Sequence, residues 1–457
     1  MFAYRFNFSS RAFVKLSFIG GRIPTRGATD RTRKLVCVFT FLLASGLSSC
    51  VSSARAQDWP QMLGPERSGQ ATQHSKPNVP WPEQATVAWQ AEIGSGYAGP
   101  AVSGEQVLVL HRKGQKEMLE SFDMTDGQSR WQTSWPASYR TSIDPDDGPR
   151  CVPTVAPAGD GDSSSSLVIC YGAAGDLSAV DVQSGKLRWH RPLRSEYQAD
   201  DGYFGAGSAP LVLGQRVIVC LGGNRAGIIA VDLETGKTLW TATDYDASYA
   251  APIAIDPSTI LVVTRLQTVL VDVATGQVLS EIRFGSRGPT VNAATPIAIG
   301  AERYLLTASY GVGMTILSTA DRQLDERLRG SDLLSSQYVT PVLSGGRLIG
   351  IDGRADVGVA SLRSIDLEAQ EVVWNQANFG TAHLIAIGPR VLTLTSSGRL
   401  ALIDATADSY REVAHCQLPA GIYRAPPALV SNKLSSQLIV RESPDNRGPG
   451  KILCIEL

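Results

Sequence analysis

A ten-residue pattern that recurs along the chain constrains its fold more than any other feature. It consists of an apolar residue, Asp, three residues, Gly, three residues and Trp. Its complete copies contain Asp123, Gly127 and Trp131; Asp181, Gly185 and Trp189; and Asp232, Gly236 and Trp240. Degenerate copies keep Asp272 and Gly276 with Ser280 in place of Trp, Asp366 and Trp374 without the Gly, and Asp404 alone.

The chemistry of this pattern is structural. Glycine adopts the positive φ of a tight turn without a steric penalty, and an indole can pack against a neighbouring repeat while its N–H finds an acceptor. Each copy therefore predicts a strand, a tight turn and an outer strand that ends in a tryptophan wedge between repeats. Because the Asp recurs in every copy, it indicates a turn rather than a catalytic group.

A proline near the start of most repeats allows the repeats to be counted. It occurs at Pro100, Pro153, Pro210, Pro252, Pro296, Pro341 and Pro426, with spacings of 53, 57, 42, 44, 45 and 85 residues. The last spacing is nearly twice the shorter ones, so one repeat lacks its proline, and Gly380-Thr-Ala-His383 falls at the expected place. Eight repeats with short runs rich in Val, Ile and Thr predict an all-β fold, an eight-bladed β-propeller of four-stranded antiparallel blades. Seven blades are the alternative if residues 297–330 do not form a full blade.

The two ends of the repeat region resemble halves of one blade. Residues 86–93 contain Trp89 and look like an outer strand without inner partners, whereas residues 451–457 look like a strand without an outer partner. Pairing them would hide two exposed edges and close the ring. We therefore expect the propeller over residues 86–457 and an N-terminal extension over residues 57–85.

Residues 1–56 have the character of a leader. Basic residues precede a largely apolar run over residues 35–47, which is too short to span a bilayer and is typical of a signal peptide. Residues 47–50, Leu-Ser-Ser-Cys, resemble a lipobox and make Cys50 a candidate for lipidation, whereas Ala54-Arg55-Ala56 is an ordinary secretory cleavage site. Both interpretations remain open, and either predicts export, to the periplasm or as an outer-membrane-anchored lipoprotein.

Charge and cysteine content exclude several classes of protein. Residues 1–56 hold 9 of the 42 Lys and Arg but one of the 43 Asp and Glu, so the chain from Gln57 onward carries a net charge of −9. This acidity argues against nucleic acid as a partner. Five cysteines remain beyond the leader, an odd number, and Cys170 and Cys220 lie in apolar runs typical of buried strands. A Cys151–Cys170 disulfide stays possible, and no C-x-x-C motif occurs.

The repeats, together with the opening Asp58-Trp-Pro-Gln-Met-Leu-Gly64-Pro65, resemble the blades of pyrroloquinoline-quinone (PQQ) repeat propellers. Two characterised groups share this blade. The quinoprotein alcohol dehydrogenases imply PQQ, a bound Ca²⁺ and a disulfide between adjacent cysteines, but no two cysteines are adjacent here. The lipoprotein propeller of the outer-membrane β-barrel assembly machinery implies a membrane anchor, here at Cys50, and a docking surface without chemistry.

The resemblance favours an exported, non-enzymatic and monomeric propeller that acts as a protein-interaction scaffold in the cell envelope. We expect envelope protein partners, no catalytic residue, no metal and no cofactor, and contact with a membrane only through an N-terminal lipid anchor. The alternative is a PQQ-dependent, alcohol dehydrogenase-like oxidoreductase that also binds Ca²⁺. A third hypothesis is a propeller that binds a carbohydrate or another small ligand at its channel. It is supported only by the channel rimmed by loops that propellers share.

Candidate binding residues cluster near the predicted starts of inner strands. Tyrosines recur there, at Tyr97, Tyr249, Tyr338 and Tyr423. The candidates for contact at the channel mouth are Arg150, Tyr203, Tyr249, Tyr338, His383 and Arg424. The run Gly94–Gly99 matches a nucleotide-loop pattern, but Pro100 and a β-rich stretch follow it in place of a helix. The acidic run Asp144–Gly148 lacks the spacing of an EF-hand and is better interpreted as a turn.

Overall fold

The computed structural model describes residues 58–71, 77–141, 143, 146–156, 166–288, 290–330, 332–431, 436–445 and 449–457. The chain divides into a first unit, Met1–Ser52, and a second unit, Ser53–Leu457, which contains all of these residues. The predicted leader, the lipobox at residues 47–50, Cys50 and the secretory cleavage site lie outside the described residues. No helix within the described ranges has the length and apolar character needed to cross a membrane.

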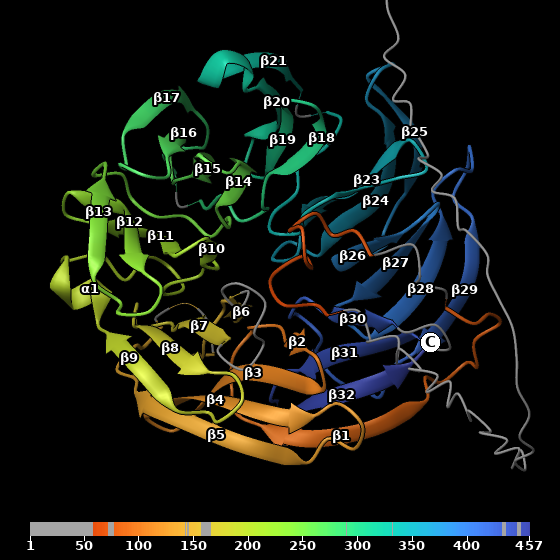
Figure 1. The fold of residues 1–457 in the computed structure, drawn as a ribbon. Helices are drawn as coiled ribbons and strands as arrows, with labels where there is room; N and C mark the ends of the chain where they lie inside the picture. The colour runs from red at the N-terminus through yellow and green to blue at the C-terminus, as the bar shows by residue number, and fades with distance from the viewer. Residues whose placement is uncertain are drawn as a thin grey trace, which may run out of the picture. The chain divides into compact units, whose positions relative to one another are not determined.

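The described part of the second unit forms eight four-stranded antiparallel sheets arranged as a propeller (Figure 1). Blade 1 contains β2 (Ala101–Ser103), β3 (Gln106–Lys113), β4 (Lys116–Asp123) and β5 (Ser129–Pro136). Blade 2 contains β6 (Thr154–Val155), β7 (Leu167–Tyr171), β8 (Leu177–Asp181) and β9 (Leu187–Arg191), followed by helix α1 (Leu193–Glu196). Blade 3 contains β10 (Leu211–Leu213), β11 (Arg216–Gly223), β12 (Ala226–Asp232) and β13 (Thr238–Ala242). Blade 4 contains β14 (Ile253–Asp256), β15 (Thr259–Val263), β16 (Gln267–Asp272) and β17 (Val278–Arg283).

Blade 5 contains β18 (Ile297–Gly300), β19 (Arg303–Ala308), β20 (Gly313–Ser318), the 3₁₀ turn η3 (Ala320–Arg322) and β21 (Asp325–Arg329). Blade 6 contains β22 (Val342–Ser344), β23 (Arg347–Arg354), β24 (Val359–Asp366) and β25 (Glu371–Gln376). Blade 7 contains β26 (Ala382–Ile387), β27 (Arg390–Thr395), β28 (Arg399–Asp404) and β29 (Glu412–Gln417). Blade 8 contains β30 (Ala428–Ser431), β31 (Ser436–Glu442), β32 (Gly450–Glu456) and, from the N-terminal side, β1 (Val87–Ile93). Eight blades are confirmed, and the complete blade 5 rules out the seven-bladed alternative.

Blade 8 closes the ring with strands from both ends of the repeat region. β1 pairs antiparallel with β32, so that Gln90 lies opposite Leu453 and Ile93 opposite Gly450. The predicted pairing of the two ends is confirmed. Because each strand would otherwise expose a row of unpaired backbone groups, this pairing removes two edges and ties the first strand to the last.

Tryptophan wedges join neighbouring blades at the positions of the repeat pattern. The indole Nε1 of Trp189 donates to the carbonyl of Leu233 at 2.9 Å, and that of Trp240 donates to the carbonyl of Val273 at 2.9 Å. Equivalent bonds join Trp89 to Met124, Trp131 to Val182 and Trp374 to Ala407. At four interfaces the ring lies against a turn glycine of the next blade, at Gly127, Gly185, Gly236 and Gly276, whose φ values are 68–76°.

Replacing Gly236 by alanine is expected to destabilise the propeller by about 2 kcal/mol. A Cβ there would lie 2.7 Å from the Trp189 ring, and φ is +68°. Gly114 is a matched control, because its φ is +61° but nothing lies within 4 Å of the position that a Cβ would take. Gly114→Ala should cost only the backbone strain, about 1 kcal/mol. Urea unfolding of both variants measures the difference, and equal losses would show that the wedge does not need the glycine.

The N-terminal segment over residues 58–71 fills the centre of the ring. Trp59 pairs with Val102 on β2, the carbonyl of Pro60 accepts from the N–H of Val155 on β6, and Gln70 bridges to Ala386 on β26. Trp59 is only 2% exposed. Since these partners lie on the innermost strands of blades 1, 2 and 7, this segment, here called the channel plug, blocks the central channel.

Candidate functional site

The candidate site lies at one end of the channel, here called the mouth. Since the four strands of each blade alternate in direction, the loops that enter each innermost strand lie at the end opposite the Asp–Gly turns. Arg150, Tyr203, Tyr249, Tyr338 and Arg424 all lie in these entering loops, and His383 is the second residue of β26. The structure therefore places all six candidate residues at the mouth.

Four of the six form one cluster together with Tyr97. The guanidinium carbon of Arg424 lies 4.8 Å from the centroid of the Tyr97 ring, and that of Arg150 lies 5.4 Å from the same centroid. The ring of His383 lies 6.1 Å from the ring of Tyr338, and its Nε2 is 2.9 Å from the carbonyl oxygen of Arg424. This mouth cluster draws its residues from the entries to blades 1, 2, 6, 7 and 8.

Backbone contacts hold the Arg150 side of the mouth cluster. Arg150 donates through Nη2 to the carbonyl of Asp146 at 2.6 Å. The Asp146 carboxylate accepts from the N–H groups of Gly96 and Gly148, at 2.8 and 2.7 Å. The N–H of Tyr97 donates to the carbonyl of Pro149 at 2.8 Å. The described part of the acidic run is thus a hydrogen-bonded turn: the Asp146 carboxylate binds backbone N–H groups, and the Asp147 carboxylate forms an ion pair with Arg140 at 2.9 Å.

At neutral pH the charge of the mouth cluster comes from its arginines. Burial lowers the pKa of His383 below its usual 6.5, so the imidazole is neutral at pH 7. Burial also raises the pKa of Tyr338, which keeps its phenol protonated. Guanidinium groups stay charged under these conditions. The cluster therefore presents two cations stacked on an aromatic ring, on a chain that is otherwise acidic.

The other two candidates belong to a second cluster at the entries to blades 3 and 4. The guanidinium carbon of Arg265 lies 5.5 Å from the centroid of the Tyr203 ring. Phe204 and Tyr249 pack edge to face at 5.8 Å, and the Tyr249 hydroxyl accepts from the N–H of Phe204 at 2.8 Å. Tyr203 and Tyr249 thus belong to a second group, which adjoins the mouth cluster because Tyr249 lies close enough to Arg150 for an electrostatic interaction.

Sequence reasoning missed several residues at this end of the propeller. Arg354 stacks on Tyr310 at 4.4 Å, and Arg194 stacks on Tyr139 at 5.9 Å. No shared spacing marks these residues, because they lie on different kinds of element: Arg354 ends β23, Arg194 lies on α1, and Tyr310 and Tyr139 lie in loops. Tyr423, the last of the recurring tyrosines, does not line the mouth. Tyr423 is 1% exposed and its hydroxyl donates to the carbonyl of Pro419, so it packs in the core while its neighbour Arg424 reaches the mouth.

Comparison with known proteins places the chain in a family. The family model described as "Outer membrane protein assembly factor BamB" matches residues 79–279 and 163–376, which together span more than half of the chain. The chain belongs to this BamB family. Among curated protein sequences, none matches it.

Solved structures related to the BamB-family chain share its propeller fold. BamB from Moraxella catarrhalis is 17% identical with a TM-score of 0.55, and the match covers 80% of this chain and 98% of that one. A quinohemoprotein alcohol dehydrogenase from Comamonas testosteroni is 14% identical with a TM-score of 0.60, over 89% and 81% of the two chains. A europium-containing methanol dehydrogenase is 12% identical with a TM-score of 0.63, over 88% and 98%. At these identities the likeness establishes the fold alone.

The PQQ-dependent alternative implies a bound Ca²⁺ and a disulfide between adjacent cysteines. Within the described ranges, no three His, Cys, Asp or Glu side chains gather so that they could hold a metal ion. The five described cysteines are buried free thiols, and burial raises the pKa of Cys220 and Cys416 to about 11. Trp59 and Arg67 of the channel plug are both buried, with partners at the innermost strands.

Proposed function

We propose that this chain is an exported, non-enzymatic propeller that binds envelope proteins at its mouth. The observation that carries the proposal is the mouth cluster above a plugged channel. Stacked tyrosine and arginine side chains are the residues most enriched at the centres of protein interfaces. Membership of the BamB family supports the envelope location, and a lipid on Cys50 would anchor the protein at the outer membrane.

The proposed role differs from catalysis in what the mouth offers to a ligand. A small substrate requires a concave pocket with converging polar groups, whereas a protein partner requires an exposed patch with a few rigid anchors. Tyr97, Arg150 and Arg424 are partly buried and give rigid anchors, because each guanidinium is held over the aromatic ring. The rest of the chain is acidic, so it would repel an acidic partner. The two arginines at the mouth would instead attract an acidic or aromatic segment of a partner.

The Arg150→Ala/Arg424→Ala variant tests this proposal. A photo-crosslinking amino acid at Tyr203, beside the mouth cluster, should give discrete adducts in envelope membranes, and the double substitution should reduce their yield about tenfold. The matched control is Arg188→Ala/Arg411→Ala, which removes two arginines that pair with the motif residues Asp181 and Asp404 at the opposite end of their blades. Unchanged adduct yield in the mouth variant, or equal loss in the control, would contradict the proposal. Titration of the purified protein with PQQ and Ca²⁺ tests the oxidoreductase alternative, which predicts saturable binding.

A further inference from the structure

The wedge between blades 5 and 6 lacks both its tryptophan and its glycine. Leu328 on β21 pairs with Ile316 immediately before a β-bulge, as Trp240 pairs with Ala230 and Trp189 with Ala179. In blade 6, Gln370 occupies the position of the turn glycine and keeps a positive φ of 57°. The backbone at this interface therefore has the conformation of the other wedges, although the tryptophan and the glycine are both replaced.

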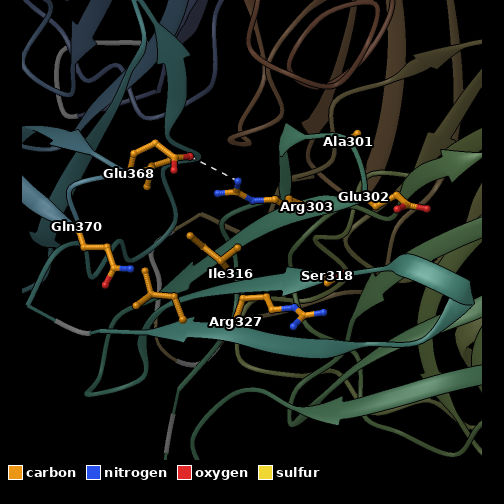
Figure 2. Close-up of a pocket in the computed structure, with 10 residues that line it drawn as sticks. Ala301, Glu302, Arg303, Ile316, Ser318, Arg327, Glu368 and Gln370 are labelled. Atoms are coloured by element: carbon orange, nitrogen blue, oxygen red, sulfur yellow. Dashed lines mark hydrogen bonds and ion pairs between the residues drawn. The ribbon is translucent and has the colours of Figure 1, made fainter. Parts of the chain in front are cut away.

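A cavity of about 440 Å³ lies at this interface. Leu328, Ile316 and Leu367 give it an apolar lining, and Arg303, Arg327 and Gln370 surround them. Figure 2 shows Ile316, Arg327 and Gln370 around the space, with Arg303 reaching toward Glu368 of the neighbouring blade, an ion pair of 3.5 Å. Leu367 follows the motif residue Asp366. At four other interfaces the residue after the motif Asp provides the carbonyl that accepts the indole N–H.

Other interfaces without a motif tryptophan are closed by the chain itself. Between blades 4 and 5, the hydroxyl of Ser280 accepts from the N–H of Leu324 at 3.0 Å, and Leu324 is 8% exposed. Between blades 7 and 8, Ala414 takes the wedge position on β29, and Trp81 of the N-terminal extension packs in the same apolar cluster. The interface between blades 5 and 6 has no such replacement among the described residues and keeps its cavity.

No tryptophan of this chain is left to fill the cavity. The chain has eight tryptophans. Five are wedges, Trp59 lies in the channel plug, Trp81 packs beside blade 8, and Trp135 is buried with its Nε1 donating to Glu117 at 3.2 Å. A second copy of the chain has the same tryptophans in the same places. An indole for this site must therefore come from a different protein.

We propose that the cavity between blades 5 and 6, the wedge slot, binds a tryptophan side chain presented by a partner protein. The inference rests on the proposed protein-binding role and adds a second contact far from the mouth cluster. Leu328 and Ile316 would bury the ring, the Leu367 backbone would offer the acceptor used at the internal wedges, and Arg303 and Arg327 favour the face of an aromatic ring. Gln370 has a side chain at the position where the internal wedges have glycine. The bound ring therefore lies further from the turn than the tryptophan rings of the internal wedges do.

The slot can be tested with N-acetyl-5-fluorotryptophanamide as the probe and ¹⁹F line broadening as the readout. The purified propeller should broaden the probe resonance with a dissociation constant on the order of 1 mM, because one side chain buries little area. Leu328→Trp/Gln370→Gly restores the internal wedge and should weaken binding at least about tenfold while raising the midpoint of thermal unfolding. Leu328→Asp replaces an apolar wall of the slot with a smaller carboxylate and should weaken binding without filling the slot.

Leu239→Trp is the matched control, since it adds an exposed tryptophan to the outer strand of blade 3, where Leu239 is 47% exposed. It should bind the probe as the unmodified protein does. Absence of broadening by the unmodified protein, or equal broadening by all variants, would overturn the proposal. Probe binding that is lost in the two slot variants but unaffected by Arg150→Ala/Arg424→Ala would support the slot even if the mouth captures no envelope protein.

Discussion

Replacing Arg67 by alanine is expected to lower the free energy of unfolding by about 4 kcal/mol. The Arg67 side chain is 4% exposed and lies in the channel plug. Its Nη1 donates to the carbonyls of Ala209 and Pro252, at 3.3 and 3.2 Å, and its Nη2 donates to the carbonyl of Pro210. Burial lowers the pKa of Arg67 to about 9, so the group remains charged at pH 7. Truncation would remove the Arg67 donor from the buried carbonyls of Ala209 and Pro252, whereas that of Pro210 would keep the Thr154 hydroxyl, and it would open a cavity beside them.

Urea unfolding of Arg67→Ala and Arg67→Met separates these contributions. Methionine keeps much of the volume but no donor, so it should recover only the part of the loss that comes from the cavity. Arg130→Ala is the control, because Arg130 makes an ion pair with Asp123 at the surface and should cost less than about 1 kcal/mol. A loss below about 1 kcal/mol for Arg67→Ala would show that the plug does not hold the inner strands together.

The architecture could be predicted because the information that determines it is local and repeated. Asp181, Gly185 and Trp189 lie within nine residues of one another and specify a turn and a wedge wherever they recur. Closure of the ring could be predicted because each end of the repeat region has a strand with an unpaired edge. The structure confirms it, since β1 pairs with β32. The opening segment was recognised only as part of a resemblance. Its role as the plug depends on contacts such as that of Arg67 with Ala209, 142 residues away.

The candidate site was only partly predictable for the same reason. Tyr338 and Arg424 could be selected because they lie beside the recurring proline or its equivalent, which marks the entry to an inner strand. Their grouping with Tyr97 and His383 depends on the curvature of the ring, which a linear pattern does not contain. Arg265 and Arg354 carry no signal of this kind. Tyr423 lies beside the same kind of proline, but its ring packs in the core, whereas its neighbour Arg424 reaches the mouth.

The degenerate repeats also differ in ways that the sequence does not show. Loss of Trp and Gly from a copy of the pattern looks like simple decay in the sequence. In the structure, two of the three interfaces without a motif tryptophan have acquired a replacement, Leu324 in one and Trp81 in the other. The third retains a cavity lined by Leu328 and Gln370. Degeneracy in a repeat therefore indicates where a propeller can gain a binding site, because the rest of the ring maintains the fold.

Glu117 is expected to make the propeller less stable as the pH rises from 4.5 to 7. The carboxyl lies on β4 and is fully buried, with its Oε1 accepting from the N–H of Ala173 at 2.7 Å and its Oε2 from Trp135 at 3.2 Å. Burial raises its pKa from 4.5 to about 7, although both hydrogen bonds oppose the shift. Between these values the folded protein holds a proton that the unfolded chain has released, so stability falls as pH rises and levels off above 7.

The expected size of this effect is about 3 kcal/mol, since each pKa unit corresponds to about 1.4 kcal/mol. Glu117→Gln cannot ionise, so subtracting its free energy of unfolding from that of the unmodified protein cancels the other titrating groups. The difference, measured by urea unfolding at several pH values from 4.5 to 8, should favour the unmodified protein most at the acidic end. The amide can accept from only one of Ala173 and Trp135, which adds a constant cost of about 1 kcal/mol at every pH. A difference that does not change with pH would mean that Glu117 ionises in the folded protein as readily as in the unfolded chain.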